Sequence, residues 1–332
     1  MTSYILRRLL ASIPLLFVVS FLVFFLSRAG GRDPVDAILG EKGTPEERAR
    51  VTRELGLDKS LLSQYGIYIG RVLRGDLGTS YIRAGESVSA EIGRRLPATI
   101  ELTMAAMFIA ILVGIPAGML SAVRPRSWID YLGMSISLAG VSIPVFWLGL
   151  LFVLAFKSWL PVSGNIDPAI DVVRRTGFTL LDCALAGDGR ALVDALRHLV
   201  LPAATLSTIP LAMTARITRS SMLEVLGSDY VRTARAKGLS PFTVVARHAF
   251  RNALVPVVTL VGLEFGYLLG GAVLTETVFD WPGLGTYTVH AVFQTDPVSI
   301  CGASMVIAAT FILANLAVDI LYAFIDPRVR YG

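Results

Sequence analysis

The chain has 332 residues, of which 54% are hydrophobic and 17% are charged, and its formal net charge at pH 7 is +5. Soluble globular domains carry about 25% charged residues, so this composition disfavours an ordinary soluble enzyme. Intrinsic disorder is excluded for the opposite reason, because disordered chains combine low hydrophobicity with high charge. The mean hydropathy of +0.65 directs attention to how the apolar residues are distributed along the chain.

Six apolar runs are long enough to cross a membrane as helices. A helix rises about 1.5 Å per residue, so about 20 residues span the hydrocarbon core. Backbone polar groups in lipid must be paired within the segment, which favours helices, and the alternating pattern of a membrane β-barrel is absent from the sequence. The prediction is an all-α integral membrane protein with six transmembrane helices, in the runs Leu9–Ser27, Leu102–Val123, Tyr131–Phe156, Leu199–Ala215, Asn252–Thr275 and Pro297–Val318.

The first run follows Arg7 and Arg8, an arrangement that a cleaved signal peptide also shows. The apolar stretch exceeds the roughly 7–15 residues of a signal peptide, and residues 27–31 form a poor cleavage site. We therefore expect the first run to be an uncleaved span.

Charge is distributed unequally between the two sides of the predicted membrane. If both termini are cytoplasmic, the inner segments 1–8, 124–130, 216–251 and 326–332 together hold 13 Arg and Lys residues but four Asp and Glu residues. The short outer segment 276–296 holds acidic residues and no basic ones. This positive-inside pattern predicts a multi-pass protein of the cell (inner) membrane with cytoplasmic N- and C-termini, and it accounts for the basic balance without a nucleic-acid partner.

The segment after the first span is predicted to be a structured extracytoplasmic loop. One helix is expected over Pro45–Leu55, with Thr44 as its N-cap and Gly56 after its end. A second helix is expected over Leu61–Leu73.

The chain is predicted to have two regions. Residues 1–98 comprise the first span and the outer loop, and residues 99–332 form the core transmembrane domain. Within the core domain, segment 157–197 contains several Pro and Gly residues, so we expect a loop with one short helix near Ala191–Arg197.

Sites for catalysis, nucleotides and metals are not indicated. None of the four lysines lies in a phosphate-binding G-x-x-x-x-G-K-[ST] loop. The histidines have no partners at metal-ligand spacing, and no Ser/His/Asp arrangement stands out. We expect this chain to bind no cofactor or metal and to be no enzyme. Cys183 and Cys301 could form a disulfide on the outer side, but two unpaired buried cysteines are the favoured alternative.

The inner segment 222–251 carries the strongest local signals. Asp229–Lys237 is predicted to be a short helix, and Gly238 suits the left-handed conformation that ends one. Ser240 can cap a second helix that has Pro241 at its first position. The prediction is a helix–glycine–helix elbow between two spans, with small residues that let a partner approach. The alternative is a basic loop beside lipid headgroups.

The elbow string YVRTARAKGL resembles the EAA loop of bacterial ABC-importer permeases, in particular the dipeptide/oligopeptide/nickel branch. Other strings similar to that branch follow one order along nearly the whole chain. They include RVLRGDLGTSY at Arg71–Tyr81, RRLPATIELT at Arg94–Thr103, LPVSG at Leu160–Gly164, RHLVLPA at Arg197–Ala203, TETVFDWPGLG at Thr275–Gly285 and IDPRVRYG at the end.

The resemblance implies a type I ABC importer permease fold and import of dipeptides or oligopeptides. It implies a heterodimer with a homologous second permease subunit in membrane lipid, two ATP-binding subunits that hold ATP and Mg, and an extracytoplasmic substrate-binding protein. The family's ATPase-coupling helix maps onto Asp229, Tyr230, Arg232, Thr233, Ala234, Arg235, Ala236, Lys237, Gly238 and Leu239. Positions 232–234 are Arg-Thr-Ala instead of Glu-Ala-Ala, so the role of that Glu is not carried over.

Small residues recur on two spans. Such stripes let helices approach closely, either between permease subunits, along a pore wall or within one subunit. The residues are Gly262, Gly266 and Gly270 in the fifth run and Gly114 and Gly118 in the second.

Glu264 lies in the middle of the fifth run, where an ionised carboxylate is costly. One interpretation is that it lines the pore and favours a substrate amine or cation. The other is a protonated or paired structural residue.

Two alternative functions remain at this point. The same architecture could import nickel, glutathione or another small solute. An ion-coupled secondary transporter would need coupling carboxylates in the spans, and Glu264 and Asp319 are the two mid-run acids.

Overall fold

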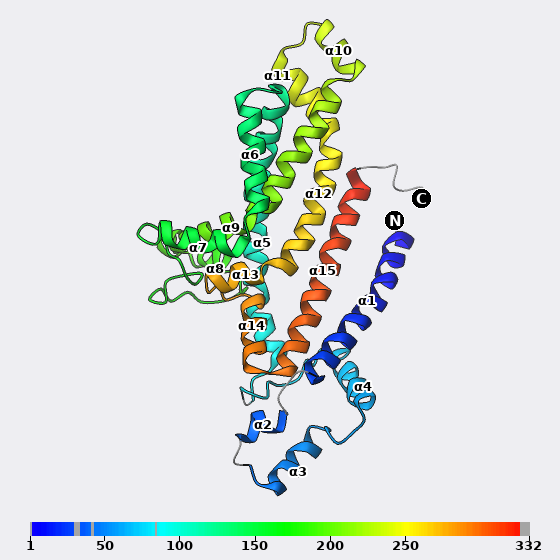
Figure 1. Cartoon of the computed structure of the whole chain (residues 1–332), viewed down its shortest axis with the longest axis vertical. Helices are drawn as coiled ribbons and strands as arrows, with labels where there is room; N and C mark the ends of the chain where they lie inside the picture. Colours follow the sequence, from blue (N-terminus) through cyan, green and yellow to red (C-terminus); the bar gives the residue numbers. More distant parts are fainter. Residues whose placement is uncertain (1, 30–33, 41–42, 84, 326–332) are drawn as a thin grey trace.

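The computed structural model describes residues 2–29, 34–40, 43–83 and 85–325, and the regular secondary structure of these residues is helical apart from one isolated bridge between Thr79 and Ser87. Long helices run side by side along the molecule (Figure 1). The elements are α1 (Thr2–Ala29), α2 (Pro34–Leu39), α3 (Pro45–Glu54), α4 (Leu61–Val72), α5 (Val88–Val123), α6 (Trp128–Ser142), α7 (Val145–Phe156), α8 (Thr179–Ala186), α9 (Gly189–Leu226), α10 (Asp229–Ala236), α11 (Pro241–Thr243), the π-helix η2 (Val244–Ala249), α12 (Phe250–Gly271), α13 (Val273–Val278), α14 (Leu284–Gln294) and α15 (Pro297–Ile325).

Among the described residues, five helical segments are long and apolar enough to cross a membrane. They are Leu10–Arg28, Val88–Val123, Gly189–Leu226, Pro241–Gly270 and Pro297–Ile320. A sixth span exists only if α6 and α7 are counted as one. These two helices are bent by 106° at the break between them.

The third predicted span is therefore broken, and α7 lies across the direction of the long helices (Figure 1). Ile143 is extended, and Pro144 precedes the first residue of α7. Proline lacks an N–H and disfavours a helical conformation at the residue before it, so the helix ends there. Pro116 and Pro210, by contrast, lie inside continuous helices.

Two spans are longer than their apolar runs. Helix α5 begins at Val88 and has 36 residues. The short helix predicted at Ala191–Arg197 is the first part of the 38-residue α9, which continues through Pro202. The predicted division at residue 98 falls inside α5 and stays a prediction, and the predicted inner segment 326–332 lies outside the described residues.

The loop after the first span is structured as predicted. Thr44 and Glu47 form a reciprocal capping box at the start of α3, and Gly56 follows its end with a φ of +65°. Helix α4 packs on α1, where the Ser20 and Tyr65 hydroxyl oxygens lie 2.8 Å apart.

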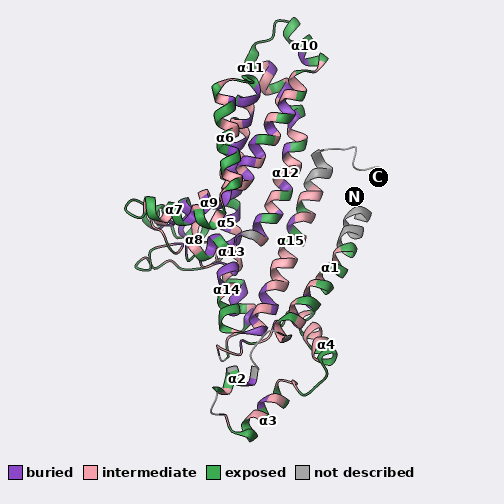
Figure 2. Ribbon diagram, viewed as in Figure 1, coloured by how far each residue is buried: buried purple, intermediate pink, exposed green. Residues whose placement is uncertain are grey.

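Buried side chains concentrate where α5, α9 and α12 meet, whereas α1 is mostly exposed (Figure 2). The largest buried cluster includes Leu102 and Ala106 of α5, Leu199 and Leu206 of α9, and Leu268 of α12. Exposed apolar residues on α1 suit a helix that faces lipid.

Candidate functional site

The candidate site is an elbow at one end of the molecule, where α10 is followed by Gly238 (Figure 1). Gly238 has a φ of +74°, and its N–H donates to the Arg235 carbonyl at 3.0 Å. A Cβ at this position would meet no atom within 4 Å. Glycine is therefore favoured here by conformation, not by lack of space, because it adopts positive φ without strain.

The second arm of the elbow differs from its prediction. Ser240 Oγ accepts the Thr243 N–H at 3.3 Å, and Pro241 occupies the first turn, both as expected. However, α11 has three residues and runs directly into η2 and then α12. The second arm is therefore the start of the fifth span, joined to it by a π-helix, which is a rare element often found at functional sites.

A small core fixes α10 to the rest of the chain. Val231 and Ala234 are buried on one face of α10 and pack with Val244 of η2. Val225 and Leu226, at the end of α9, pack against the same cluster. The small side chain of Ala234 thus serves this internal packing, which corrects the expectation that it helps a partner to approach.

A side-chain hydrogen bond joins α10 to the fifth span. Asn252 of α12 donates from Nδ2 to the Tyr230 hydroxyl at 2.7 Å. Together with the small core, this bond connects the elbow to both α9 and α12. The elbow is therefore attached to two of the long helices.

The remaining predicted coupling residues lie on the exposed surface of the elbow. Asp229 and Arg232 form a 3.5 Å ion pair that is largely exposed and therefore contributes little stability. Phe242 is 81% exposed and was not predicted as part of the site. An aromatic residue in a polar, capped turn is a sequence signal that could have identified it. The exposed members of the predicted set are Asp229, Tyr230, Arg232, Thr233, Arg235, Ala236, Lys237, Gly238 and Leu239.

This surface combines three cationic side chains with exposed aromatic and aliphatic groups, among them Tyr230, Leu239 and Phe242. Arginine and aromatic residues are enriched where protein partners bind. The elbow therefore has the composition of a docking surface for a protein with an acidic, partly apolar recess.

The glycine stripes lie mainly at helix contacts within the chain. A Cβ on Gly262 would lie 2.0 Å from Val318 Cγ1, and one on Gly266 would lie 2.3 Å from Asn315 Oδ1, so both glycines pack α12 against α15. On α5, a Cβ on Gly118 would lie 2.5 Å from the Ala215 carbonyl oxygen of α9. Of the interpretations left open by the sequence, packing within one subunit holds for these positions. Gly270, the third glycine of the stripe on α12, differs, because a Cβ there would meet no atom within 4 Å.

Glu264 is half-buried on α12. No hydrogen bond or ion pair of its carboxylate is found among the described residues. The alternative in which Glu264 is a paired structural residue therefore finds no partner for its carboxylate in the described part of this chain. The side chain is available to a group outside it.

A buried polar cluster, the Glu276 cluster, lies away from the elbow and consists of Ala98, Thr99, Glu276, Trp281 and Thr286. Glu276 Oε1 accepts the Thr99 hydroxyl at 2.6 Å, and Oε2 accepts the Thr286 N–H at 3.0 Å. The Trp281 Nε1–H donates to the Ala98 carbonyl at 2.9 Å. These bonds join two of the strings that carried the family resemblance, Arg94–Thr103 and Thr275–Gly285.

Glycines fit closely around this carboxylate. A Cβ on Gly283 would lie 2.3 Å from Glu276 Oε1, and one on Gly285 would lie 2.8 Å from Oε2. Burial raises the pKa of Glu276 to about 7, although the hydrogen bonds from Thr99 and Thr286 act to lower it. Sequence analysis placed Glu276 only in an acidic outer segment and missed the cluster, because Thr99 is 177 residues away.

Both cysteines are buried and unpaired, which is the favoured alternative of the sequence analysis. Cys183 packs between α8 and α9, and Cys301 on α15 lies 3.4 Å from the Ser27 hydroxyl oxygen.

Comparison with known proteins covers both halves of the chain. Residues 114–331 match the family described as "Binding-protein-dependent transport system inner membrane component". Residues 1–103 match "Binding-prot-dependent transport system membrane comp, N-term".

Curated relatives match over the full length. The chain is 47% identical to the di/tripeptide transport system permease protein DppB of Pseudomonas aeruginosa (strain UCBPP-PA14), covering 100% of this chain and 99% of the relative. It is 45% identical to the dipeptide transport system permease protein DppB of Alkalihalophilus pseudofirmus, covering 100% of both. It is 40% identical to the glutathione transport system permease protein GsiC of Salmonella paratyphi A, again over 100% of both.

The fold also resembles a chain of a solved structure, the inward-facing MetNI methionine ABC transporter. The TM-score is 0.54 at 17% identity, and the match covers 71% of this chain and 97% of that chain. This likeness concerns the fold alone and agrees with the expected type I importer permease architecture.

Proposed function

The chain belongs to the family of binding-protein-dependent transport system inner membrane components, and from this premise we propose that it is a permease subunit of an ATP-driven ABC importer of dipeptides and short oligopeptides. The peptide substrate is supported by relatives that match it over their whole length. The observation that carries the proposal is the elbow, which presents an exposed docking surface and is fixed to α9 and α12.

In the proposed complex this chain forms half of the translocation pore, together with a homologous second permease subunit. Two ATP-binding subunits dock on the cytoplasmic side and hold ATP and Mg, and an extracytoplasmic protein delivers the substrate. The chain itself binds no cofactor and catalyses no reaction. The elbow and both termini are cytoplasmic, in keeping with the charge asymmetry of the sequence.

ATP-driven closure of the ATPase pair would move the elbow. Because the elbow core includes Val225 of α9 and Val244 of η2, its displacement tilts the fourth and fifth spans together. This tilt would alternate access to the pore between the two membrane faces.

Glu264 is proposed to face the translocation path. Its carboxylate is half-buried and has no partner among the described residues, and intramembrane carboxylates commonly mark a transport pathway. A peptide carries an ammonium group at its N-terminus that the carboxylate could pair with. Wild-type uptake of all peptides by a Glu264→Gln variant would contradict this role.

Glutathione is a second candidate substrate. The similarity to a glutathione transport system permease extends over the full length of both chains. Competition between labelled dipeptide and glutathione for uptake by the same complex distinguishes the two candidates.

The elbow proposal is tested by Gly238→Pro in the assembled complex in lipid, with peptide uptake and substrate-stimulated ATP hydrolysis as readouts. Proline removes the N–H that bonds to Arg235 and cannot adopt the positive φ. We expect uptake to fall at least about tenfold, within the usual range of coupling energies.

The matched control is Gly187→Pro, at the end of α8. Gly187 has a φ of +70°, open space around it and an N–H that donates to the Ala184 carbonyl at 3.1 Å. Its local geometry is thus like that of Gly238, but it lies outside the elbow. Unchanged uptake by an assembled Gly238→Pro complex would remove the elbow as the transmitting element.

A further inference from the structure

A cavity lies at the end of the molecule opposite the elbow, where α1 ends, α15 begins and α4 packs beside them (Figure 1). It is partly open, and its empty space together with the part open to solvent is about 630 Å³. Arg28, at the end of the first span, and Pro297, at the start of the last, both line it. The cavity is therefore at the level of one membrane surface.

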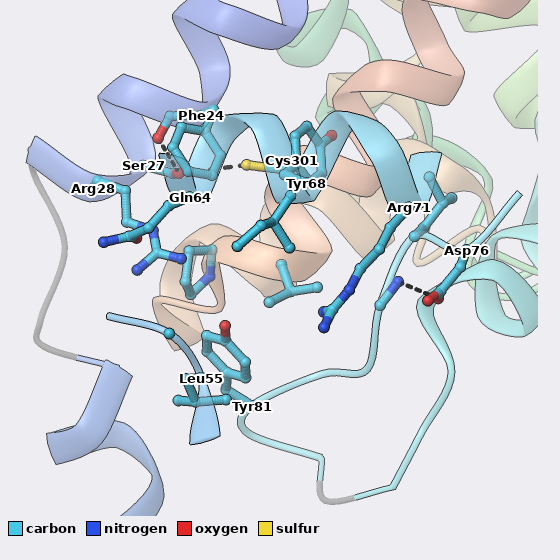
Figure 3. A pocket seen from close by; sticks show the side chains of 16 residues that line it. Phe24, Ser27, Arg28, Leu55, Gln64, Tyr68, Arg71, Asp76, Tyr81 and Cys301 are labelled. Carbon is cyan, nitrogen blue, oxygen red and sulfur yellow. Dashed lines mark hydrogen bonds between the residues drawn. The ribbon is translucent and has the colours of Figure 1, made fainter. Parts of the chain in front are cut away.

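Two arginines supply positive charge to this cavity. Arg28 of α1 and Arg71 of α4 line it from different elements (Figure 3). Neither guanidinium has an ion-pair partner among the described residues. The acid in the lining, Asp76, accepts the Gly78 N–H at 2.8 Å. The cavity thus holds two cations against one engaged carboxylate, which favours an anionic ligand.

The lining also has hydrogen-bonding capacity that the described chain does not use. Tyr68 Oη and Gln64 Oε1 are buried without a hydrogen-bond partner among the described residues. The Tyr81 hydroxyl points into the cavity (Figure 3). Burial raises the pKa of Tyr81, although the charge of Arg28, a hydrogen bond with the Arg28 side chain and the charge of Arg71 act to lower it, so this hydroxyl stays protonated at neutral pH and can donate to a ligand. Buried polar groups without partners commonly mark a ligand or ordered water.

The rest of the environment is apolar. Leu77 and Val298 form part of the cavity wall. On the face of α1 that carries Phe24, Phe17 and Phe21 are 43% and 40% exposed, so an apolar surface extends along the span from the cavity. A small soluble anion would use only the arginines and hydroxyls. A molecule with a charged head and apolar tails would use both parts.

We propose that this cavity binds the phosphate headgroup of a phospholipid from the membrane leaflet opposite the elbow, with Arg28 and Arg71 at the phosphate and the acyl chains along α1. Arginine is well suited to phosphate, since guanidinium donors match its oxygens. The lipid would connect α1, α4 and α15, and so hold the mostly exposed first span to the core. This role is separate from the proposed transport of peptides.

The test is to count the phospholipid retained by the detergent-purified complex of this chain with its partner subunits, by native mass spectrometry. The variants are Arg71→Gln and the double variant Arg28→Gln/Arg71→Gln. The matched control is Arg74→Gln, an exposed arginine beside the same helix end that does not line the cavity. Each lining arginine removed should weaken lipid retention about fivefold, as expected for a basic side chain at an anionic surface. The control should retain lipid like the wild type.

Equal retention by the double variant and the wild type would overturn the proposal. The proposal would also be overturned if millimolar inorganic phosphate stabilised the delipidated complex through the same arginines and no phospholipid were retained. The site would then take a soluble anion. If the double variant does not assemble, the single variant Arg71→Gln still decides the test, because Arg71 is exposed. Peptide uptake is measured separately, so a failure here does not affect the proposed function.

Discussion

The elbow and the Glu276 cluster differ in how their structure is maintained. In the elbow most side chains are exposed, and the shape depends on Gly238 and the small core around Val231. In the Glu276 cluster the carboxylate and Trp281 are buried, and the bonds made by Thr99 and Trp281 cross between distant parts of the chain. We therefore expect the stability of the elbow to tolerate side-chain change better than backbone change. A buried polar cluster is expected to tolerate neither.

The largest effect is expected from Trp281→Ala. Trp281 is 1% exposed, and the substitution removes both its buried ring and the bond from its indole N–H to the Ala98 carbonyl. We expect a loss of about 3–5 kcal/mol in the free energy of unfolding, as for other buried aromatic truncations. Thermal unfolding of the purified complex measures it, with Trp159→Ala as the control because Trp159 is 70% exposed. Similar melting temperatures for the two variants would show that the cluster is not a centre of stability.

The second-largest expected effect is a dependence of stability on pH that comes from Glu276 and that we do not expect for the elbow. The pKa of Glu276 is raised from 4.5 to about 7, so between these values the folded chain binds more protons than the unfolded chain. The stabilisation is therefore complete below about pH 4.5 and is lost as the pH rises to about 7, a change of about 2–3 kcal/mol. Glu276→Gln cannot ionise and should flatten this part of the stability curve. Parallel curves for variant and wild type would contradict the assignment to Glu276.

Paired glycine substitutions contrast the two regions directly. In Gly283→Ala the new Cβ would collide with the Glu276 carboxylate, which is held by two hydrogen bonds, so we expect a loss of about 1–3 kcal/mol. In Gly238→Ala the Cβ enters open space, and the positive φ alone costs about 1 kcal/mol. Denaturant or thermal unfolding of both variants checks the order. A larger loss for Gly238→Ala would reverse the comparison.

The smallest effect on stability is expected from Tyr230→Phe. Asn252 loses an exposed hydrogen bond that water can replace, so unfolding should change by less than about 1 kcal/mol. Peptide uptake per ATP hydrolysed should nevertheless fall about two- to fivefold, because α10 loses a link to α12. Tyr131→Phe is the control, since Tyr131 is exposed on α6 and its hydroxyl makes no hydrogen bond with α10 among the described residues. Equal uptake ratios in the two variants would show that the bond does not transmit motion.

Features set by neighbouring residues were predictable from the sequence. The capping of α3 by Thr44, the positive φ at Gly238 and the Ser240–Pro241 helix start all depend on a few adjacent residues, and all three are confirmed. Run length likewise predicted the spans, because the thickness of the hydrocarbon core imposes it.

Features set by distant residues were not predictable. Thr99 and Glu276 are 177 residues apart, so no local pattern signals their bond. The stripe of Gly262 and Gly266 indicated close packing, but only the fold shows that α15 is the neighbour. Proline gave an ambiguous signal, because Pro144 ends a helix whereas Pro210 lies within one, and neighbouring helices decide which outcome is stable.

The unbroken length of α9 has a mechanical consequence. Its 38 residues extend about 57 Å, nearly twice the thickness of the hydrocarbon core. One end carries Val225 and Leu226 in the elbow core, so in the proposed mechanism a displacement of the elbow would tilt the whole helix. A tilt of about 5° about its centre moves each end by about 2.5 Å in opposite directions. The displacement at the far end of α9 would thus depend on the tilt angle and on the position of the tilt axis along the helix. Moving that axis would change the ratio of the two end displacements without changing any contact at the elbow.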